Sequence, residues 1–458
     1  MKNRWFVVLG ALIIQVSLGA VYIWSVFQTP LLTHFPTWKE THVTWPAQII
    51  LACFALAVIV AGRLQDKFGP RPVAITGGLL LGLGLILARF TASFPPSTAL
   101  LWLILTYSVL GGLGIGAAYV CPIATCVKWF PDKRGLITGL AVAGFGAGAF
   151  FFAPLAKALI SGGPYQLLGK NLFSLPQVGL FNTFLVLGLI FLVTITAGAM
   201  FLKNPEPGYQ PAGWHPPLKN ESSQNLRVDF TPKEMLGTWQ FRLLWAVYLT
   251  GCAAGLMVIM KASPIWQSFA LSSLTSGLDS AGFNAIASAG ALAVSILAIF
   301  NSLGRIVWGK ISDGAGRKNT LLAMFLICGV SMLFLNQMRE FHLFLIGISL
   351  IGLCFGGFLA VFPAVTADYF GTKNYGANYG WMFSAYGLGG ILGPYLAAAL
   401  MKTAAVVRIK SFRPGEEGVV KTLIIGDYRL AFLVAGTLCL ISAVALIFLK
   451  KPEIKKED

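Results

Sequence analysis

Long apolar runs alternate with short polar connections along almost the whole chain. Each run holds about 20 residues, the length that an α-helix needs to cross the hydrocarbon core of a bilayer. Six runs precede the longest polar stretch and six follow it. They lie at 5–27, 43–62, 72–92, 98–122, 135–160, 177–202, 241–262, 283–308, 319–337, 341–366, 376–402 and 429–449. The pattern predicts an all-α membrane protein with twelve transmembrane helices.

The long polar stretch divides the chain. It is rich in proline and ends in Thr231-Pro232-Lys233-Glu234, a capping box with proline at the first helical position. We expect an N-terminal six-helix bundle over 1–202, a cytoplasmic linker with a short interfacial helix over 203–240, and a C-terminal six-helix bundle over 241–458. The first run follows a short basic N-terminus, but it is too long for a signal peptide, so we interpret it as the first transmembrane helix.

Composition excludes several classes of protein. Hydrophobic residues make up 56% of the chain and charged residues only 11%, against roughly 25% charged residues in an ordinary soluble domain. A soluble enzyme, a disordered chain and a nucleic-acid-binding domain are therefore poor interpretations. The net charge of +17 fits contact with anionic lipid. Lysine and arginine gather in alternate connections, which predicts a plasma-membrane protein with both termini in the cytoplasm; the basic loop 403–428 is the exception.

The polar residues within the runs indicate no enzyme chemistry. All seven cysteines lie in apolar runs, and no pair combines metal-ligand spacing with a polar setting. We see no buried Ser–His, His–Glu or paired-carboxylate set. The sequence thus predicts neither an enzyme nor a metal or cofactor site, and we expect the cysteines to be small packing residues.

Two pairs of segments indicate that the halves are related. The loop Gly62–Arg71 and the loop Gly309–Lys318 both read G-x-x-x-D-x-x-G followed by basic residues. The aspartates, Asp66 and Asp313, can each cap a helix N-terminus or pair with a neighbouring arginine. The glycine-rich segments at 139–148 and 380–389 also align, which places Phe145 and Tyr386 at equivalent positions.

The paired loops resemble the signature of the major facilitator superfamily. Within it, the segments at 19–27 (GAVYIWSVF) and 127–136 (VKWFPDKRGL) are similar to the oxalate/formate exchangers, which are related to the proton-linked monocarboxylate transporters. The resemblance implies two bundles around a central cavity, alternating access and function as a monomer. It also implies that the loop residues hold the inner gate; these are Asp66, Arg71, Asp313 and Arg317.

Arg305 is the candidate substrate anchor, because a charge within a span is costly and indicates function. Asn301 lies four residues before it, hence on the same helical face. A guanidinium binds a carboxylate through two parallel hydrogen bonds. The resemblance implies the same role, since both related families use an arginine in span eight. Alternatively, Arg305 lies only roughly 12 Å along the helix from Asp313 and could snorkel to the interface.

Departures from the family pattern bear on the substrate. Oxalate carriers place a lysine where Tyr386 stands, so a dianion would lose its second cation, and we expect a monoanion. Animal monocarboxylate carriers place an aspartate where Asn301 stands, and no Asp or Glu lies deep in any span here. A proton could travel with the substrate; otherwise the protein exchanges anions or is a uniporter.

We therefore expect a proton-coupled secondary transporter of short monocarboxylates such as L-lactate or pyruvate. An exchanger of oxalate, formate or similar anions is the alternative, and a carboxylate sensor with a carrier fold is a third interpretation. The expected partners are the carboxylate, protons and the lipid bilayer, with no nucleic acid. Further cavity candidates, each of which could instead be a packing residue, are Tyr22, Tyr119, Phe145, Phe358, Phe362 and Tyr386. From opposite halves, Phe145 and Tyr386 are expected to set substrate size.

Overall fold

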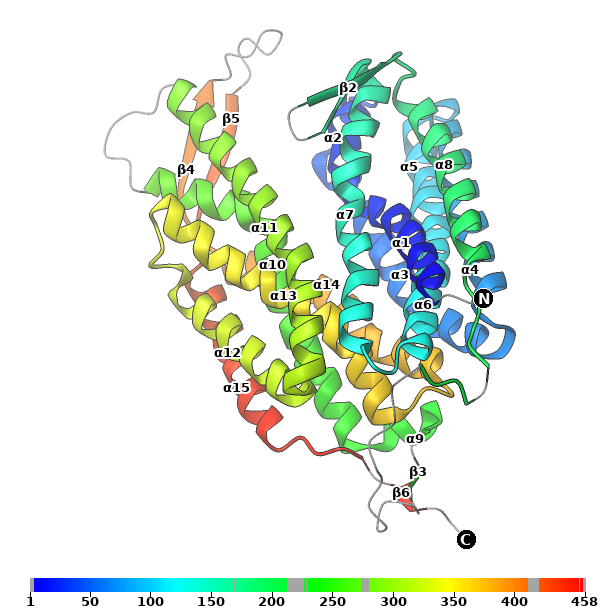
Figure 1. Ribbon diagram of the computed structural model, residues 1–458. Helices are drawn as coiled ribbons and strands as arrows, with labels where there is room; N and C mark the ends of the chain where they lie inside the picture. The colour runs from blue at the N-terminus through cyan, green and yellow to red at the C-terminus, as the bar shows by residue number, and fades with distance from the viewer. Residues whose placement is uncertain are drawn as a thin grey trace. The chain divides into compact units, whose positions relative to one another are not determined.

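Helices form most of the part of the protein that the structure describes. The computed structural model describes residues 4–167, 170–206, 208–211, 226, 227, 229–272, 280–410, 420–452, 454 and 455. The helices of its first part are α1 (Trp5–Leu18), α2 (Ser25–His34), α3 (Glu40–Phe68), α4 (Pro70–Ala88), α5 (Pro96–Leu103), α6 (Gly111–Trp129), α7 (Arg134–Ser161) and α8 (Leu180–Met200). After the linker follow α9 (Pro232–Gly237), α10 (Trp239–Ser272), α11 (Ser280–Ala315), α12 (Arg317–Leu335), α13 (Phe341–Phe370), α14 (Tyr375–Leu400) and α15 (Arg429–Ile447) (Figure 1).

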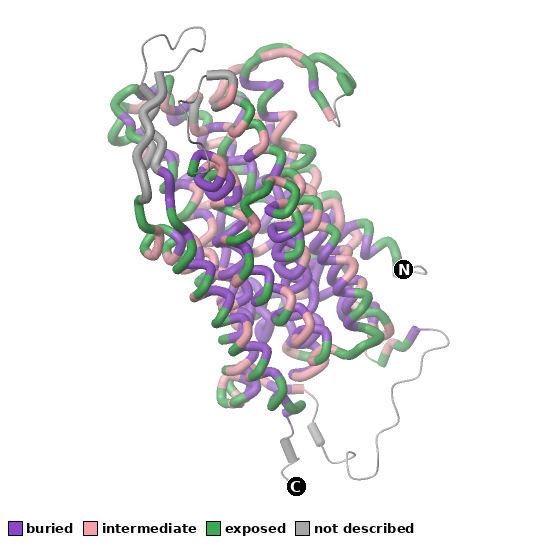
Figure 2. The backbone as a smooth tube through the Cα atoms, turned by 90° about the vertical axis from the view of Figure 1, so that its left-hand side faces the viewer, coloured by how far each residue is buried: buried purple, intermediate pink, exposed green. Residues whose placement is uncertain are grey.

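Twelve helical stretches in the described part of the chain are long and apolar enough to span a membrane. The sequence prediction of an all-α protein with twelve transmembrane helices is therefore confirmed. Buried and exposed residues alternate around the helices (Figure 2). Large apolar side chains such as Leu56, Val193 and Ile299 are exposed, as expected for helix faces that lipid covers.

The chain divides into two compact units. The first unit contains residues 1–242, 360–387 and 450–458, and the second contains 243–359 and 388–449. Helices α10, α13 and α14 therefore each contribute to both units. The predicted boundaries at 203–240 stay a prediction, and linker residues 207, 212–225 and 228 lie outside the described part.

Within the first unit, α4 packs against α6 and α8, α3 against α6, and α1 against α7 (Figure 1). Two spans are irregular. A 3₁₀ segment, η1 (Gly19–Ile23), interrupts the first span, and a π-helical segment, η3 (Ile104–Leu110), lies in the fourth. Such segments often mark functional positions within transmembrane helices.

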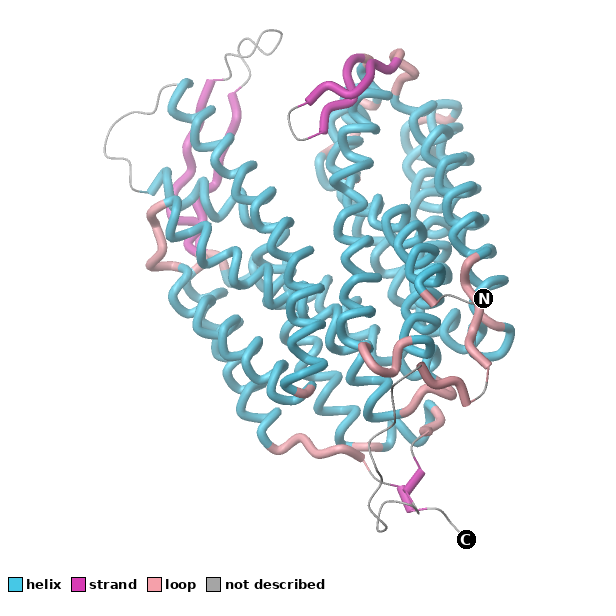
Figure 3. The backbone as a smooth tube through the Cα atoms, in the orientation of Figure 1, coloured by secondary structure: helices cyan, strands magenta, loops and turns pink. Residues whose placement is uncertain are grey.

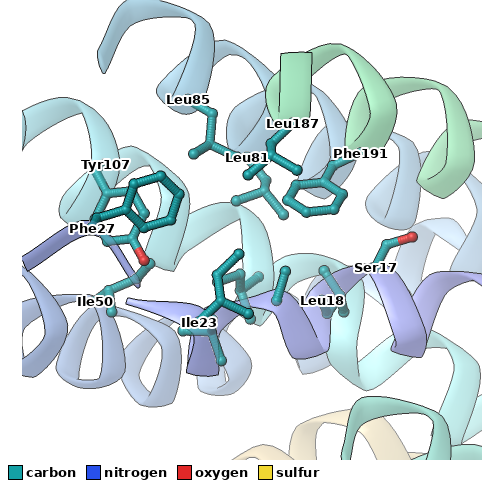
Figure 4. Close-up of a pocket in the computed structure, with 13 residues that line it drawn as sticks. Ser17, Leu18, Ile23, Phe27, Ile50, Leu81, Leu85, Tyr107, Leu187 and Phe191 are labelled. Atoms are coloured by element: carbon teal, nitrogen blue, oxygen red, sulfur yellow. The ribbon is translucent and has the colours of Figure 1, made fainter. Parts of the chain in front are cut away.

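A small cavity lies between these irregular segments (Figure 4). Its walls include Phe27, Tyr107 and Phe191, with Ser17 at one end. The cavity measures about 20 Å³, room for about one water molecule. It is therefore too small for a carboxylate substrate.

Short antiparallel strand pairs lie outside the membrane-spanning helices (Figure 3). The sequence analysis did not predict them. Strand β1 (Gly163–Leu167) pairs with β2 (Lys170–Leu175), β3 (Leu226–Arg227) with β6 (Ile454–Lys455), and β4 (Lys402–Lys410) with β5 (Val420–Asp427). The basic loop 403–428 is thus largely the β4–β5 hairpin.

The predicted capping box before α9 is confirmed. The backbone N–H of Thr231 donates to the Glu234 carboxylate at 2.6 Å, and the backbone N–H of Glu234 donates to the Thr231 hydroxyl at 3.4 Å. Pro232 occupies the first helical position. This local pattern fixes the start of the short helix that precedes α10.

Candidate functional site

Arg305 lies on α11 in the second unit and is fully buried. Its Nε and one terminal nitrogen both donate to the side-chain oxygen of Asn301, each at a distance of 3.3 Å. Asn301 and Arg305 therefore lie on one helical face, as their spacing predicts, and their roles toward a substrate stay predictions. The burial does not fit the alternative in which the guanidinium snorkels to the surface.

The approach of α13 holds this pair in place. A Cβ atom on Gly356 would lie 1.9 Å from the backbone oxygen of Asn301, and one on Gly304 would lie 2.0 Å from the backbone oxygen of Leu353. Only glycine permits backbones to come this close. The two helices therefore touch directly beside Asn301 and Arg305, which restricts the directions that both side chains can take.

An aromatic cluster lies in the first unit and brings together three of the predicted residues. The ring centroid of Phe145 is 5.3 Å from that of Tyr119 and 5.4 Å from that of Tyr22. Phe54 of α3 lies against the same group, 5.0 Å from Tyr119. These edge-to-face contacts join the first, second, fourth and fifth spans.

Tyr386 on α14 completes the aromatic cluster. Its hydroxyl is hydrogen-bonded to the hydroxyl of Tyr22 at a distance of 2.8 Å. Phe383 stacks on Tyr386 at 4.8 Å and lies 4.9 Å from Tyr119. Tyr22 is 38% exposed, whereas Tyr386 is only 4% exposed. The hydroxyl pair is therefore partly buried, and it joins a buried residue of the cluster to an exposed one.

Sequence reasoning missed Phe54 and Phe383. Phe383 lies three residues before Tyr386, so the helical spacing could have placed both on one face. Phe54 belongs to no motif, and only the packing of α3 brings it to the cluster.

The two remaining predicted cavity residues are fully buried on α13. Phe358, in the second unit, packs on Phe325 with ring centroids 4.5 Å apart. This contact fits the packing alternative. Phe362, in the first unit, accepts the Thr366 hydroxyl through its backbone oxygen at 2.8 Å.

The two related loops use their aspartates differently. The Asp66 carboxylate accepts the backbone N–H groups of Gly376 and Ala377 at 3.1 and 2.8 Å, so it caps the N-terminus of α14, and Lys128 lies 3.6 Å away. Asp313 instead forms a local ion pair with Arg317 at 2.8 Å. Each aspartate therefore shows one of the two predicted interactions.

Further contacts of the first unit involve the helix ends. Arg71 donates to the backbone oxygen of Met200 at 2.8 Å, which ties the start of α4 to the end of α8. Arg134 and Asp368 form an ion pair at 2.5 Å that joins α7 to α13. The sequence analysis did not single out this second pair.

Twelve apolar spans, a buried cation and capped interhelical loops define a multi-pass membrane carrier. The sequence matches the Major Facilitator Superfamily over residues 5–298 and 267–458. The chain belongs to this superfamily, and it is a membrane transporter, not an enzyme. The solved structure of the proton:xylose symporter XylE bound to 6-bromo-6-deoxy-D-glucose has the same fold, with a TM-score of 0.64 at 12% identity over 98% of this chain and 96% of that chain.

Relatives confirm the resemblance read from the motifs. The uncharacterized MFS-type transporter YhjX of Escherichia coli (strain K12) is 30% identical over 85% of this chain and 86% of its own length. The oxalate:formate antiporter of Oxalobacter formigenes is 28% identical over 87% and 85%. Monocarboxylate transporter 12 of Xenopus laevis is 26% identical over 94% and 85%.

Proposed function

We propose that the chain is a proton-coupled secondary transporter of short monocarboxylates of the L-lactate and pyruvate type, which works by alternating access. The burial of Arg305 carries this proposal. Among the described residues it is the only charged side chain that is buried. A buried guanidinium is well matched to a carboxylate, and a single buried cation balances a single negative charge. The names of two relatives, an oxalate:formate antiporter and a monocarboxylate transporter, support small organic anions as substrates.

We assign the carboxylate to Arg305 and Asn301, and the limit on substrate size to the aromatic cluster. Phe358 and Phe362 serve as buried supports of the site on α13. The gate is assigned to Asp66, Arg71, Asp313 and Arg317. The basic connections support a plasma-membrane location with both termini in the cytoplasm.

An oxalate/formate-type exchanger is the second candidate, favoured by the Oxalobacter formigenes relative. Tyr386 stands against it, because a tyrosine donates one hydrogen bond but supplies no second cation for a dianion. Its hydroxyl is also engaged with Tyr22.

Uptake of labelled L-lactate into liposomes tests the proposal. With an inward proton gradient and an empty lumen, we expect uptake to rise with the gradient and to collapse when the gradient is dissipated. Because no Asp or Glu lies deep in a span, uptake that depends on the gradient would mean that the substrate itself carries the proton. Uptake that requires oxalate, formate or another carboxylate inside the vesicle would instead establish an exchanger.

Phe145→Ala should widen the range of substrates. The ring of Phe145 contacts both Tyr22 and Tyr119, so its removal opens the wall beside the hydroxyl pair. We expect uptake of 2-hydroxyvalerate relative to L-lactate to rise by about 10-fold, the effect of one or two methylenes in an apolar pocket. Phe184→Ala removes an equally buried ring that packs on Phe27, and it should leave the ratio unchanged. An unaltered uptake ratio in Phe145→Ala would show that Phe145 does not limit substrate size.

A further inference from the structure

Trp308 on α11 holds a buried hydrogen-bond donor that nothing in the described part of the chain satisfies. The side chain is only 8% exposed, and its Nε1–H has no hydrogen-bond partner among the described residues. A buried indole N–H normally finds an acceptor, so an unsatisfied one requires an explanation. A ligand oxygen would provide the missing acceptor.

The position of Trp308 links it to the proposed anchor. Asn301, Arg305 and Trp308 follow one another at the i, i+4 and i+7 positions of α11, hence on one helical face. Consecutive glycines of α13 touch the two outer members. A Cβ atom on Gly356 would lie 1.9 Å from the backbone oxygen of Asn301, and one on Gly357 would lie 2.5 Å from Cδ1 of Trp308.

We propose that Trp308 is a substrate-binding residue whose Nε1–H donates to the oxygen on carbon 2 of a 2-hydroxy or 2-oxo monocarboxylate. The inference rests on the proposed function. The guanidinium fork of Arg305 uses both carboxylate oxygens. The next oxygen of such an acid then requires a neutral donor on the same face, and the Nε1–H of Trp308 is a donor without a partner among the described residues.

This assignment makes Trp308 a determinant of specificity. Propionate and acetate lack the oxygen on carbon 2, so they leave the buried N–H without an acceptor. Sites built to bind a substrate oxygen reject analogues that lack it more strongly than apolar pockets reject a changed methylene. The protein should therefore prefer L-lactate and pyruvate over propionate by at least about 10-fold.

Trp308→Phe tests the assignment, because it keeps an aromatic ring and removes the N–H. The matched control is Trp266→Phe. Trp266 lies in the same unit, is 9% exposed and also has an Nε1–H without a partner among the described residues, but it packs on Phe341 with centroids 4.7 Å apart. In proteoliposomes we expect Trp308→Phe to raise KM for L-lactate and pyruvate about 10-fold and to leave KM for propionate unchanged. Trp266→Phe should change none of these values.

The possible outcomes distinguish a failure of this inference from a failure of the proposed function on which it rests. A lactate-to-propionate ratio that survives in Trp308→Phe overturns the inference alone, and so does an equal loss for all acids. If the variant does not fold, the wild-type protein still decides, because equal wild-type affinities for lactate and propionate contradict the assignment. Wild-type protein that transports none of these acids overturns the proposed function together with the inference.

Discussion

Replacing Arg305 by lysine should lower carboxylate transport by at least about 100-fold, while the chain still folds. Lysine keeps the positive charge but has no planar fork, so it cannot hold both carboxylate oxygens in parallel hydrogen bonds. In the native protein the guanidinium is fully buried and already oriented by Asn301 through two contacts of 3.3 Å. An ammonium at this position loses one or both of those contacts. Initial rates of L-lactate uptake in proteoliposomes measure the effect, and thermal unfolding of the purified protein checks the fold.

Arg339→Lys is the matched control for this substitution. Arg339 belongs to the same unit, but it is exposed, and its Nε donates to the backbone oxygen of Asn336. We expect normal transport in the control, since an exposed interaction of this kind contributes little. Full transport by Arg305→Lys would contradict bidentate binding and leave only the charge as the recognised feature.

The fold could be predicted from the sequence because a membrane helix must satisfy its own backbone hydrogen bonds, so each apolar run specifies one element. Finer features do not follow from hydropathy. The first span predicted at 5–27 is interrupted at Gly19–Ile23 by a 3₁₀ segment. Apolar residues are compatible with both α-helical and 3₁₀ turns, so hydropathy does not distinguish them. A search for apolar runs does not detect the β-hairpins either.

The sequence could predict those parts of the site whose residues lie close together along the chain. Asn301 and Arg305 lie one helical turn apart, so the spacing alone brings them together. Phe54 reaches the aromatic cluster only through the packing of α3, which no local pattern encodes. The aspartates of the related loops show the same limit, because Asp313 pairs with Arg317 four residues on, whereas Asp66 caps a helix more than 300 residues away.

Gly62→Ala should reduce transport by at least about 10-fold through its effect on the contact between α3 and α14. A Cβ atom on Gly62 would lie 2.0 Å from the backbone oxygen of Gly376, far inside van der Waals contact. The helices would have to separate, and Asp66, one turn further along α3, would lose its bonds to Gly376 and Ala377. Overpacking of this kind costs about 1–3 kcal/mol, and the capping bonds add to it. In the alternating-access cycle proposed above, every conformation is required, so depleting this one slows the whole cycle.

Gly390→Ala is the control, since the methyl group would meet only Leu256 Cδ1 at an ordinary 3.5 Å. A chemical cross-link separates a shifted conformation from unfolding. Arg134 and Asp368 form an ion pair within the same unit as Gly62, so Arg134→Cys with Asp368→Cys should cross-link readily with a short bifunctional reagent. Adding Gly62→Ala should lower the yield several-fold while thermal unfolding stays cooperative, because the defect is local to the helix ends of this unit. Unchanged transport and cross-linking in Gly62→Ala would show that this helix contact does not limit the cycle.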